Sequence, residues 1–248
     1  MLINPLENIN IAELTELTSQ FFTSRIRYKA AIRKVRTYLQ ILNDEFNVLH
    51  QRNPIHHLSS RIKDPVSIAE KLKRKGFPVT LESAIANLTD IAGVRIVCSY
   101  LEDVYKIADL VKHEPGFRII RESDYIKTPK SNGYRSLHFI ISVPVVVYEK
   151  HLQVPVELQI RTIAMDFWAS LEHRLRYKNS TTAVPVSLET DLIKAANDIA
   201  AIDLKMQKLY NETMNLYPET QAQSRIQMNL VQSLMDEEEL DIFFPLNK

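Results

Sequence analysis

Apolar residues recur at alternating steps of four and three along two long stretches, one near each end of the chain. This is the spacing of one face of a helix. The first stretch predicts a helix from about residue 10 to a stop near Pro54, roughly 60 Å long at ~1.5 Å per residue. The two apolar faces comprise Tyr28, Ile32, Val35, Leu39, Leu42, Phe46 and Leu49, and Leu192, Ala195, Ile199, Ile202, Met206, Leu209 and Leu216. Such helices pack on the core, on each other or on another copy of the chain, and the first two are the simpler interpretations.

Between these helices the pattern changes to short alternating or apolar runs separated by helical segments. We therefore predict an α/β or α+β fold, a mixed sheet flanked by helices. The predicted division is an N-terminal helical segment 1–52, a central domain 53–180 and a C-terminal helical extension 181–248 that ends in an acidic run. The predicted strands are 60–63, 91–100, 117–120, 136–148 and 153–161, and the predicted helices between them are 65–75, 101–112 and 163–177.

Composition places the protein among globular chains and restricts where an anion can bind. Hydrophobic residues make up 45% and charged residues 25%, and the formal net charge is +1. This charge gives no overall case for nucleic acid or an anionic membrane, so RNA binding is possible but unsupported. Cys98 is the only cysteine, which excludes a disulfide framework. The start lacks the pattern of a signal peptide, and we expect a cytoplasmic protein.

Two carboxylates stand at positions suited to a metal ion. In VELQIRT, alternation places Glu157, Gln159 and Arg161 on one strand face. Asp90 stands at the start of another strand, in TDIAGVRI. Asp90 and Glu157 on neighbouring strands would form a Mg²⁺ site, because Mg²⁺ is held by one or two carboxylates plus substrate phosphates. The alternatives are a solvent-facing strand for Glu157 and a turn or helix cap for Asp90.

A cationic block begins in the first predicted strand. SRIKDPVSIAEKLKRKG carries six basic and two acidic residues from Arg61 to Lys75, a local net charge of +4. Arg61 and Lys63 share a strand face, and Lys71 and Arg74 share a helix face. A solvated basic helix is the simplest interpretation. A clamp for polyphosphate is the alternative, because both pairs converge on one end of the sheet.

The loop TPKSNGYRSLHF contains one of only four glycines in the chain. Gly133 would permit a turn with positive φ, and Tyr134 offers a flat face to a base. Lys130, Arg135 and His138 could reach phosphates. A plain hairpin loop with a buried tyrosine at its base is the alternative, and nothing in KTPKSNG indicates order before a ligand binds.

The predicted helix 163–177 has a polar stripe that includes Asp166, Ser170 and His173. A carboxylate can accept hydrogen bonds from both N1–H and the exocyclic N–H of guanine, so Asp166 is a candidate purine reader. An acidic residue placed favourably on the helix dipole explains Asp166 equally well.

Several common nucleotide and hydrolase motifs are missing. The sequence has no GxxxxGK[ST], GxGxxG or HExxH, which excludes a P-loop NTPase and a simple dinucleotide-binding protein. No His-Asp dipeptide occurs, so the simplest signature of a metal-dependent phosphohydrolase is absent too. His56 and His57 are interpreted as loop residues.

Five segments in register resemble the synthetase domain of RelA/SpoT-type alarmone synthetases. They are SRIKDPVSIAEKLKRKG, DIAGVRI, PKSNGYRSLH, VELQIRT and AMDFWASLEHRLRYK, within residues 50 to 180. The resemblance implies a nucleotidyltransferase-like fold in a small, stand-alone member with no hydrolase domain. It implies transfer of the β,γ-pyrophosphate of ATP to the 3′-hydroxyl of GDP or GTP, giving ppGpp or pppGpp for stress signalling. Small members commonly form homotetramers through flanking helices.

The resemblance also implies roles for individual residues. Arg61 and Arg95 would sandwich the adenine, Tyr134 would stack on the guanine, and Glu157 would also accept the proton of the attacking hydroxyl. The implied catalytic residues are Glu157, Asp90 and Arg74, with Asp90 and Glu157 binding Mg²⁺. The implied ATP-binding residues are Arg61, Lys63, Ser67, Lys71, Arg74 and Arg95, and the implied GDP- or GTP-binding residues are Lys130, Asn132, Tyr134, Arg135, His138, Gln159, Arg161, Asp166 and His173.

Two rival hypotheses remain at this point. The first keeps the chemistry but changes the acceptor to an adenosine nucleotide or the 3′ end of a tRNA. The lack of a basic excess argues against tRNA, and Asp166 argues against adenosine. The second is a catalytically inactive module on the same fold that binds RNA or a partner. The presence of both Asp90 and Glu157 argues against it.

Overall fold

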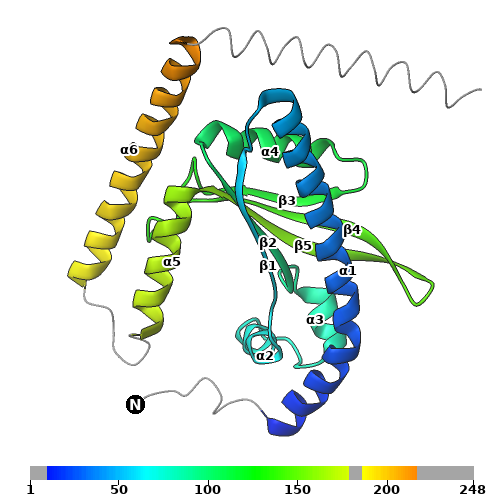
Figure 1. Cartoon of the computed structure of the whole chain (residues 1–248). Coiled ribbons are helices and arrows are strands. Elements are labelled where there is room, and N and C mark those ends of the chain that lie inside the picture. Colours follow the sequence, from blue (N-terminus) through cyan, green and yellow to red (C-terminus); the bar gives the residue numbers. More distant parts are fainter. Residues whose placement is uncertain (1–9, 179–185, 217–248) are drawn as a thin grey trace, which may run out of the picture.

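A five-stranded mixed sheet forms the centre of the computed structural model, which describes residues 10–178 and 186–216 (Figure 1). The strand order is β1-β2-β5-β4-β3, with β2 and β5 parallel and the other neighbours antiparallel. This confirms the predicted mixed sheet flanked by helices. The strands are β1 Ile55–Ile62, β2 Ala92–Cys98, β3 Arg118–Asp124, β4 Leu137–Val147 and β5 Lys150–Thr162, and the helices are α1 Ile11–His50, α2 Pro65–Arg74, α3 Leu81–Asn87, α4 Leu101–His113, α5 Ile163–Lys178 and α6 Val186–Leu216.

Helix α1 crosses the sheet and buries the apolar stripe that predicted it (Figure 1). It begins after Asn10, whose side chain accepts a hydrogen bond from the Ala12 N–H, and it ends before Gln51, which is left-handed at φ 51°. Its buried residues and those of α4 pack on alternate residues of β2, β4 and β5 in one continuous core. Each large apolar side chain buried there contributes about 1.5–3 kcal/mol relative to exposure. The first helix therefore packs on the core, as one of the simpler interpretations held.

Local sequence signals explain α2 and the hairpin between β4 and β5. The Asp64 side chain caps α2, Pro65 occupies its first turn, and Gly76 follows with φ +74°, a conformation that favours glycine. The hairpin closes through Tyr148 and Glu149, both with positive φ, which suits a two-residue turn of the primed type. Strand β5 therefore begins at Lys150, earlier than the predicted 153, whereas β4 ends at Val147, one residue before the predicted end.

Three element predictions need correction. Strand β1 begins at Ile55, so His56 and His57 lie on an edge strand and not in a loop. Strand β3 continues to Asp124 instead of ending at Ile120, because its outer residues pair with β4. Helix α3, capped by Thr80, was not predicted, since seven residues are too few to show a clear period.

Helices α5 and α6 lie side by side at one end of the sheet (Figure 1). Thr162 caps α5, because its hydroxyl accepts a hydrogen bond from the Met165 N–H at 3.1 Å. Helix α6 confirms the second predicted helix as far as Leu216, and the acidic run lies outside the described residues. No helix within residues 10–178 and 186–216 has a stretch long and apolar enough to cross a membrane.

Candidate active site

Two rows of side chains run across all five strands on the sheet face opposite α1 and α4. Strand pairing sets these rows, because residues aligned on neighbouring strands project to the same face. The predicted polar face of β5 is confirmed, since Glu157 and Gln159 lie one in each row. The rows are Arg61, Gly93, Glu157, Ile140 and Arg121, and Ser59, Arg95, Gln159, His138 and Ser123.

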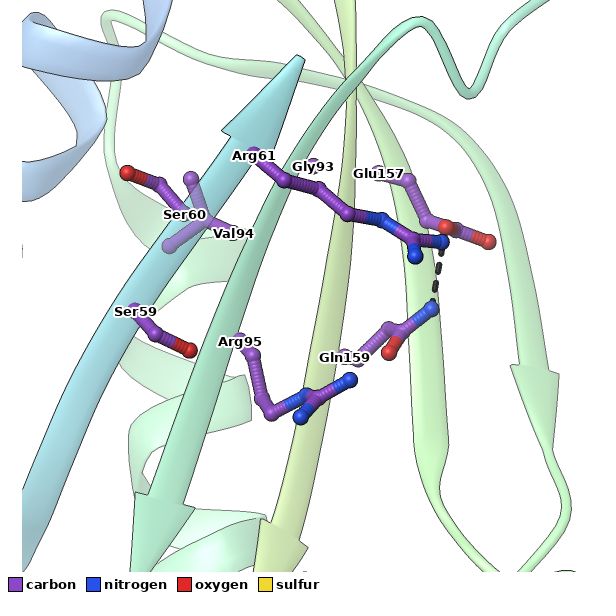
Figure 2. Close-up of a pocket in the computed structure, with 8 residues that line it drawn as sticks. All are labelled: Ser59, Ser60, Arg61, Gly93, Val94, Arg95, Glu157 and Gln159. Carbon is purple, nitrogen blue, oxygen red and sulfur yellow. Dashed lines mark hydrogen bonds between the residues drawn. The ribbon is translucent and has the colours of Figure 1, made fainter. Parts of the chain in front are cut away.

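A first hollow of about 230 Å³ lies at one end of these rows, where residues of β1, β2 and β5 line it. Figure 2 shows the side chains of Arg61 and Arg95 running the same way across the sheet toward Glu157 and Gln159. Gly93 lies between the two arginines, and a Cβ there would meet the Arg61 Cγ at 3.8 Å. Arg61 and Arg95 lie on neighbouring strands in adjacent rows, and adjacent rows are about 6.6 Å apart along a strand, close to the ~7 Å that a flat ring needs between two stacked groups. This hollow therefore has the spacing to hold a purine between two guanidinium groups.

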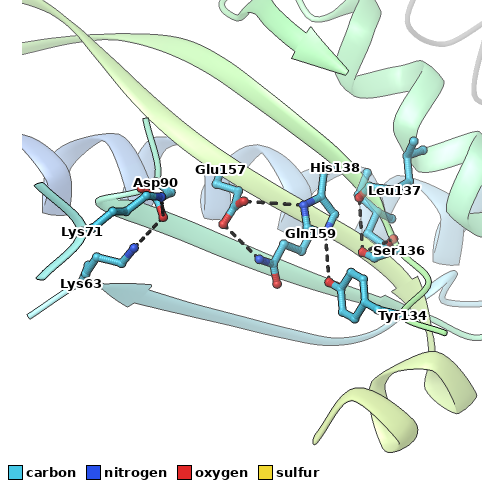
Figure 3. Close-up of polar contacts among 10 residues, drawn as sticks. Lys63, Lys71, Asp90, Tyr134, Ser136, Leu137, His138, Glu157 and Gln159 are labelled. Carbon is cyan, nitrogen blue, oxygen red and sulfur yellow. Dashed lines mark hydrogen bonds and ion pairs between the residues drawn. The ribbon is translucent and has the colours of Figure 1, made fainter. Parts of the chain in front are cut away.

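Asp90 joins the two lysines of the cationic block. Its Oδ2 accepts hydrogen bonds from Lys63 Nζ at 2.6 Å and Lys71 Nζ at 2.5 Å (Figure 3). Burial by itself would raise the pKa of Asp90, but the two ammonium groups lower it below the usual value. The carboxylate is therefore ionised at neutral pH. Asp90 lies two residues before β2, so it is on the segment that enters the strand and not on the strand itself.

Glu157 lies in the centre of the sheet with two polar neighbours. Gln159 Nε2 donates to Glu157 Oε2 at 3.0 Å, and His138 Nδ1 is 3.6 Å from Glu157 Oε1 (Figure 3). Burial would raise the pKa of Glu157, and nearby Asp90 adds to that, but His138 and Gln159 outweigh both and lower it. Two ionised carboxylates therefore face one region, which is an arrangement that a divalent cation would stabilise.

A second hollow of about 340 Å³ is lined by both carboxylates and by an aromatic cluster. The Tyr134 hydroxyl lies 2.9 Å from His138 Nε2, and the rings of Tyr125, Tyr134 and His138 meet edge to face. The Lys130 ammonium lies over the rings of Tyr125 and Tyr134, at 4.6 Å and 5.1 Å from their centroids. This hollow combines flat faces with cations, as a second nucleotide would require.

Five predicted residues lie elsewhere or are already engaged. Ser67 binds the capping carboxylate of Asp64, Arg74 is exposed in the last turn of α2, and Asn132 donates to Glu172 at 3.1 Å. Arg135 turns toward α6. His173 is exposed on α5. The predicted roles of these five in nucleotide binding stay predictions.

Arg161 and Asp166 form a buried link to the first hollow. Arg161 is 1% exposed, and its Nε lies 3.0 Å from Asp166 Oδ1. The same oxygen lies 3.5 Å from Arg95 Nη1. Burial is the main reason that the pKa of Arg161 is lowered, with further lowering from Arg95 and Arg61. The structure therefore places Asp166 beside Arg95 of the first hollow, whereas the sequence suggested that Asp166 reads guanine.

Sequence reasoning missed three residues that line the second hollow, Arg121, Ser123 and Tyr125. Arg121 and Ser123 alternate on β3, so they share the face of the two rows. Continuing the period-two pattern of β3 past Ile120 would have indicated the first two. Tyr125 follows the strand and carries no local signal.

Comparison with known proteins gives matches along most of the chain. Residues 60–182 match a family described as "Region found in RelA / SpoT proteins". GTP pyrophosphokinase YwaC of Bacillus subtilis is 46% identical over 179 residues, which are 72% of this chain and 85% of that protein. GTP pyrophosphokinase YjbM of the same organism is 31% identical over 187 residues, which are 75% of this chain and 87% of that protein.

Solved structures share the fold. Small alarmone synthetase 2 from Bacillus subtilis is 44% identical with a TM-score of 0.68, over 75% of this chain and 96% of that one. Small alarmone synthetase 1 from Bacillus subtilis, bound to its product pppGpp, is 30% identical with a TM-score of 0.72, over 79% of this chain and 99% of that one.

Proposed function

The chain belongs to the RelA/SpoT family as one of its small alarmone synthetases, and we propose that it transfers the β,γ-pyrophosphate of ATP to the 3′-hydroxyl of GDP or GTP. In this reaction a bond forms between the 3′-oxygen and the β-phosphorus, the bond from that phosphorus to the α,β-bridging oxygen breaks, and AMP leaves. One observation carries the proposal. Asp90 and Glu157 line the second hollow together, and Glu157 also lines the first, so a carboxylate lies where the two cation-lined hollows meet.

ATP occupies the hollow between Arg61 and Arg95 in this proposal. The adenine stacks between the two guanidinium groups, since their spacing along the sheet suits one flat ring. Lys63 and Lys71 then lie beside Asp90, where the phosphates follow. Arg74, exposed one helical turn after Lys71, extends the same cationic side of α2.

The two carboxylates fit Mg²⁺. Asp90 Oδ1 is buried and has no hydrogen-bond partner within the described part of the chain, and both groups are ionised oxygen donors. Asp90 and Glu157 would hold the ion together with the substrate phosphates. When bound, the ion offsets the charge of the transferring phosphates. Without the ion, Lys63 and Lys71 balance the negative charge of Asp90.

GDP or GTP occupies the second hollow, with its base on Tyr134 and its phosphates near Lys130 and His138. Burial raises the pKa of Tyr134, so its phenol stays neutral and keeps its contact with His138. Glu157 lies between the two nucleotides and accepts the proton of the 3′-hydroxyl. Little covalent help is needed for such a transfer, because it depends mostly on position and charge.

The proposal includes a homotetramer in the cytoplasm. Helix α6 leaves large apolar side chains exposed after packing on α5, and α1 leaves others on its outer side. They include Ile202 53%, Leu204 60%, Met206 47% and Leu209 46% on α6, and Phe22 63%, Ile26 41%, Ile41 51% and Val48 49% on α1. Size-exclusion chromatography with light scattering measures the mass of the assembly. A monomer at micromolar concentration would contradict the homotetramer.

A turnover assay with separated nucleotides tests the function. The protein is incubated with ATP, Mg²⁺ and one acceptor at a time, GDP, GTP, ADP or deacylated tRNA, and the products are resolved by anion-exchange chromatography. We expect AMP together with a guanosine tetra- or pentaphosphate, only with GDP or GTP. Formation of product with ADP or tRNA would assign a different acceptor. The absence of AMP in every incubation would refute the proposed enzymatic activity.

A further inference from the structure

The acceptor loop, Lys130–Arg135, contains a turn with its own hydrogen bonds. The Gly133 N–H donates to the Lys130 carbonyl at 2.8 Å, and the Lys130 N–H donates to the Tyr134 carbonyl at 3.2 Å. The Asn132 side-chain oxygen accepts from the Tyr134 N–H at 3.2 Å. The segment KTPKSNG gave no sign of these bonds, and the expectation that the loop orders when a ligand binds stays a prediction. These local bonds set the shape of the turn but not its place on the protein.

Gly133 lies directly against helix α6. It has φ +88°, as its predicted turn requires, and it is buried. A Cβ on Gly133 would come within 2.7 Å of the Ala196 Cβ and 3.7 Å of Trp168 Cζ2. Ala196 is itself only 3% exposed. Two small residues, 63 positions apart in sequence, therefore allow the backbone of the loop to approach α6 closely.

Arg135 fixes the other side of the turn to the same helix. Its Nη1 donates to the carbonyl oxygens of Gly133 and Ala196, both at 3.3 Å, and its Nη2 donates to Asn197 Oδ1 at 3.1 Å. The guanidinium thus joins the loop to α6. Tyr134 lies between Gly133 and Arg135, so contacts with α6 flank it on both sides in sequence.

Helix α6 is in turn anchored to the rest of the fold. Trp168 Nε1 donates to the Leu192 carbonyl at 3.0 Å, and the Thr162 hydroxyl donates to Asp203 at 2.6 Å. One turn further, Gln207 accepts from the Glu102 N–H at 2.9 Å. The helix is therefore a rigid support for the loop, since its contacts reach α5, the end of β5 and the start of α4.

We infer that α6 positions the acceptor loop, so that Arg135, Ala196 and Asn197 are positioning residues that hold the Tyr134 ring where the acceptor base stacks. The inference rests on the proposed function for the identity of that base. It gives Arg135 a role through α6, where the sequence suggested direct contact with GDP or GTP. It also makes α6 part of the acceptor specificity of the enzyme, although no residue of α6 lines either hollow.

The test compares acceptor and donor kinetics in variants of the full chain. Ala196→Leu places a larger side chain against Gly133, and we expect the KM for GTP to rise more than about tenfold with the KM for ATP unchanged. Asn197→Ala removes one hydrogen bond to a charged group, so a rise of about three- to tenfold is expected. Asn197→Asp keeps an acceptor oxygen and should retain the wild-type value. Lys194→Ala, an exposed change on the same helix, is the matched control.

Tryptophan emission gives a reading that does not depend on activity. Trp168 is the only tryptophan in the chain and lies against both Gly133 and α6, so Ala196→Leu should shift its emission to the red and Lys194→Ala should not. Equal changes in KM for ATP and GTP, or an unchanged KM for GTP in both Ala196→Leu and Asn197→Ala, would overturn the inference. An inactive wild-type protein would instead refute the proposed function, and a shifted emission would then still show that Ala196 packs beside Gly133 and Trp168.

Discussion

The donor and acceptor sides of the site are built in different ways. On the donor side, Arg61 and Lys63 lie within or just after β1, and Lys71 lies on α2, which follows within a few residues. On the acceptor side, Tyr134 lies in a loop whose place depends on α5 and α6, up to 63 residues away. The donor side is therefore made by neighbouring segments of regular structure, whereas the acceptor side is assembled by tertiary contacts.

This difference indicates where each substrate is controlled. Cations on a strand and a helix keep their positions as long as the sheet is folded. A loop held by a few hydrogen bonds to another helix can lose its position while the fold persists, because each such bond contributes only about 0.5–3 kcal/mol. We therefore expect changes far from the site to affect the acceptor more than the donor.

Glu157→Gln affects the donor and the acceptor side together and should have the largest effect on turnover. The carboxylate accepts the proton and binds the metal, so we expect turnover to fall by about 10²–10⁴-fold while both nucleotides still bind. Glu82→Gln, an exposed change at the start of α3, is the control. Turnover is measured by chromatography and binding by calorimetry. Wild-type turnover in Glu157→Gln would refute the role of this side chain.

Tyr134→Ala should weaken binding on the acceptor side and leave binding on the donor side unchanged. Stacking of a base on an aromatic ring is worth about 1–3 kcal/mol, so the Kd for GTP should rise about 10- to 100-fold. The Kd for ATP should stay within about twofold, because Arg61 and Arg95 hold the adenine. Tyr134→Phe keeps the ring and loses the hydroxyl with its contact to His138. If calorimetry shows both nucleotides weakened alike, the base does not stack here.

Asp166→Asn tests whether Asp166 belongs to the donor side or to the acceptor side. The structure places Asp166 against Arg95, so we expect the KM for ATP to rise about three- to tenfold and that for GTP to stay unchanged. The pair is partly exposed, which keeps the effect moderate. Asp166→Glu retains the charge and serves as the control. The opposite pattern, a rise for GTP alone, would support the guanine-reading role suggested by the sequence.

Asp203→Asn should give the smallest effect, and only on stability. Burial raises the pKa of Asp203, so its contribution is fully present below the unfolded pKa of about 4 and is lost as pH rises through the folded pKa. The Tm of the wild type relative to Asp203→Asn should therefore fall from pH 4 to pH 7, by about 2–4 °C. Asp191→Asn, exposed on α6, is the control. A difference in Tm that is constant with pH would contradict the shifted pKa.

The donor side and most of the sheet could be predicted from local patterns. Alternation in VELQIRT placed Glu157 and Gln159 on one face, and the pairing with β2 and β4 confirms this face. Capping residues Asp64 and Thr162 explain where α2 and α5 begin, because each cap acts on the first turn of its own helix. The short helix α3 and the outer half of β3 escaped prediction, since neither has a long enough period.

The sequence by itself determined the two long helices, the strands that carry Arg95 and Glu157, and the residue types of the site, because these depend on spacing within one element. Only the tertiary structure decided that Asp166 lies beside Arg95 and that Arg135 joins the loop to Asn197. These contacts join segments distant in sequence, and their partners are set by how α5 and α6 pack at the end of the sheet. Local periodicity carries no information on such packing, since it describes the faces of an element and not the neighbour that covers each face.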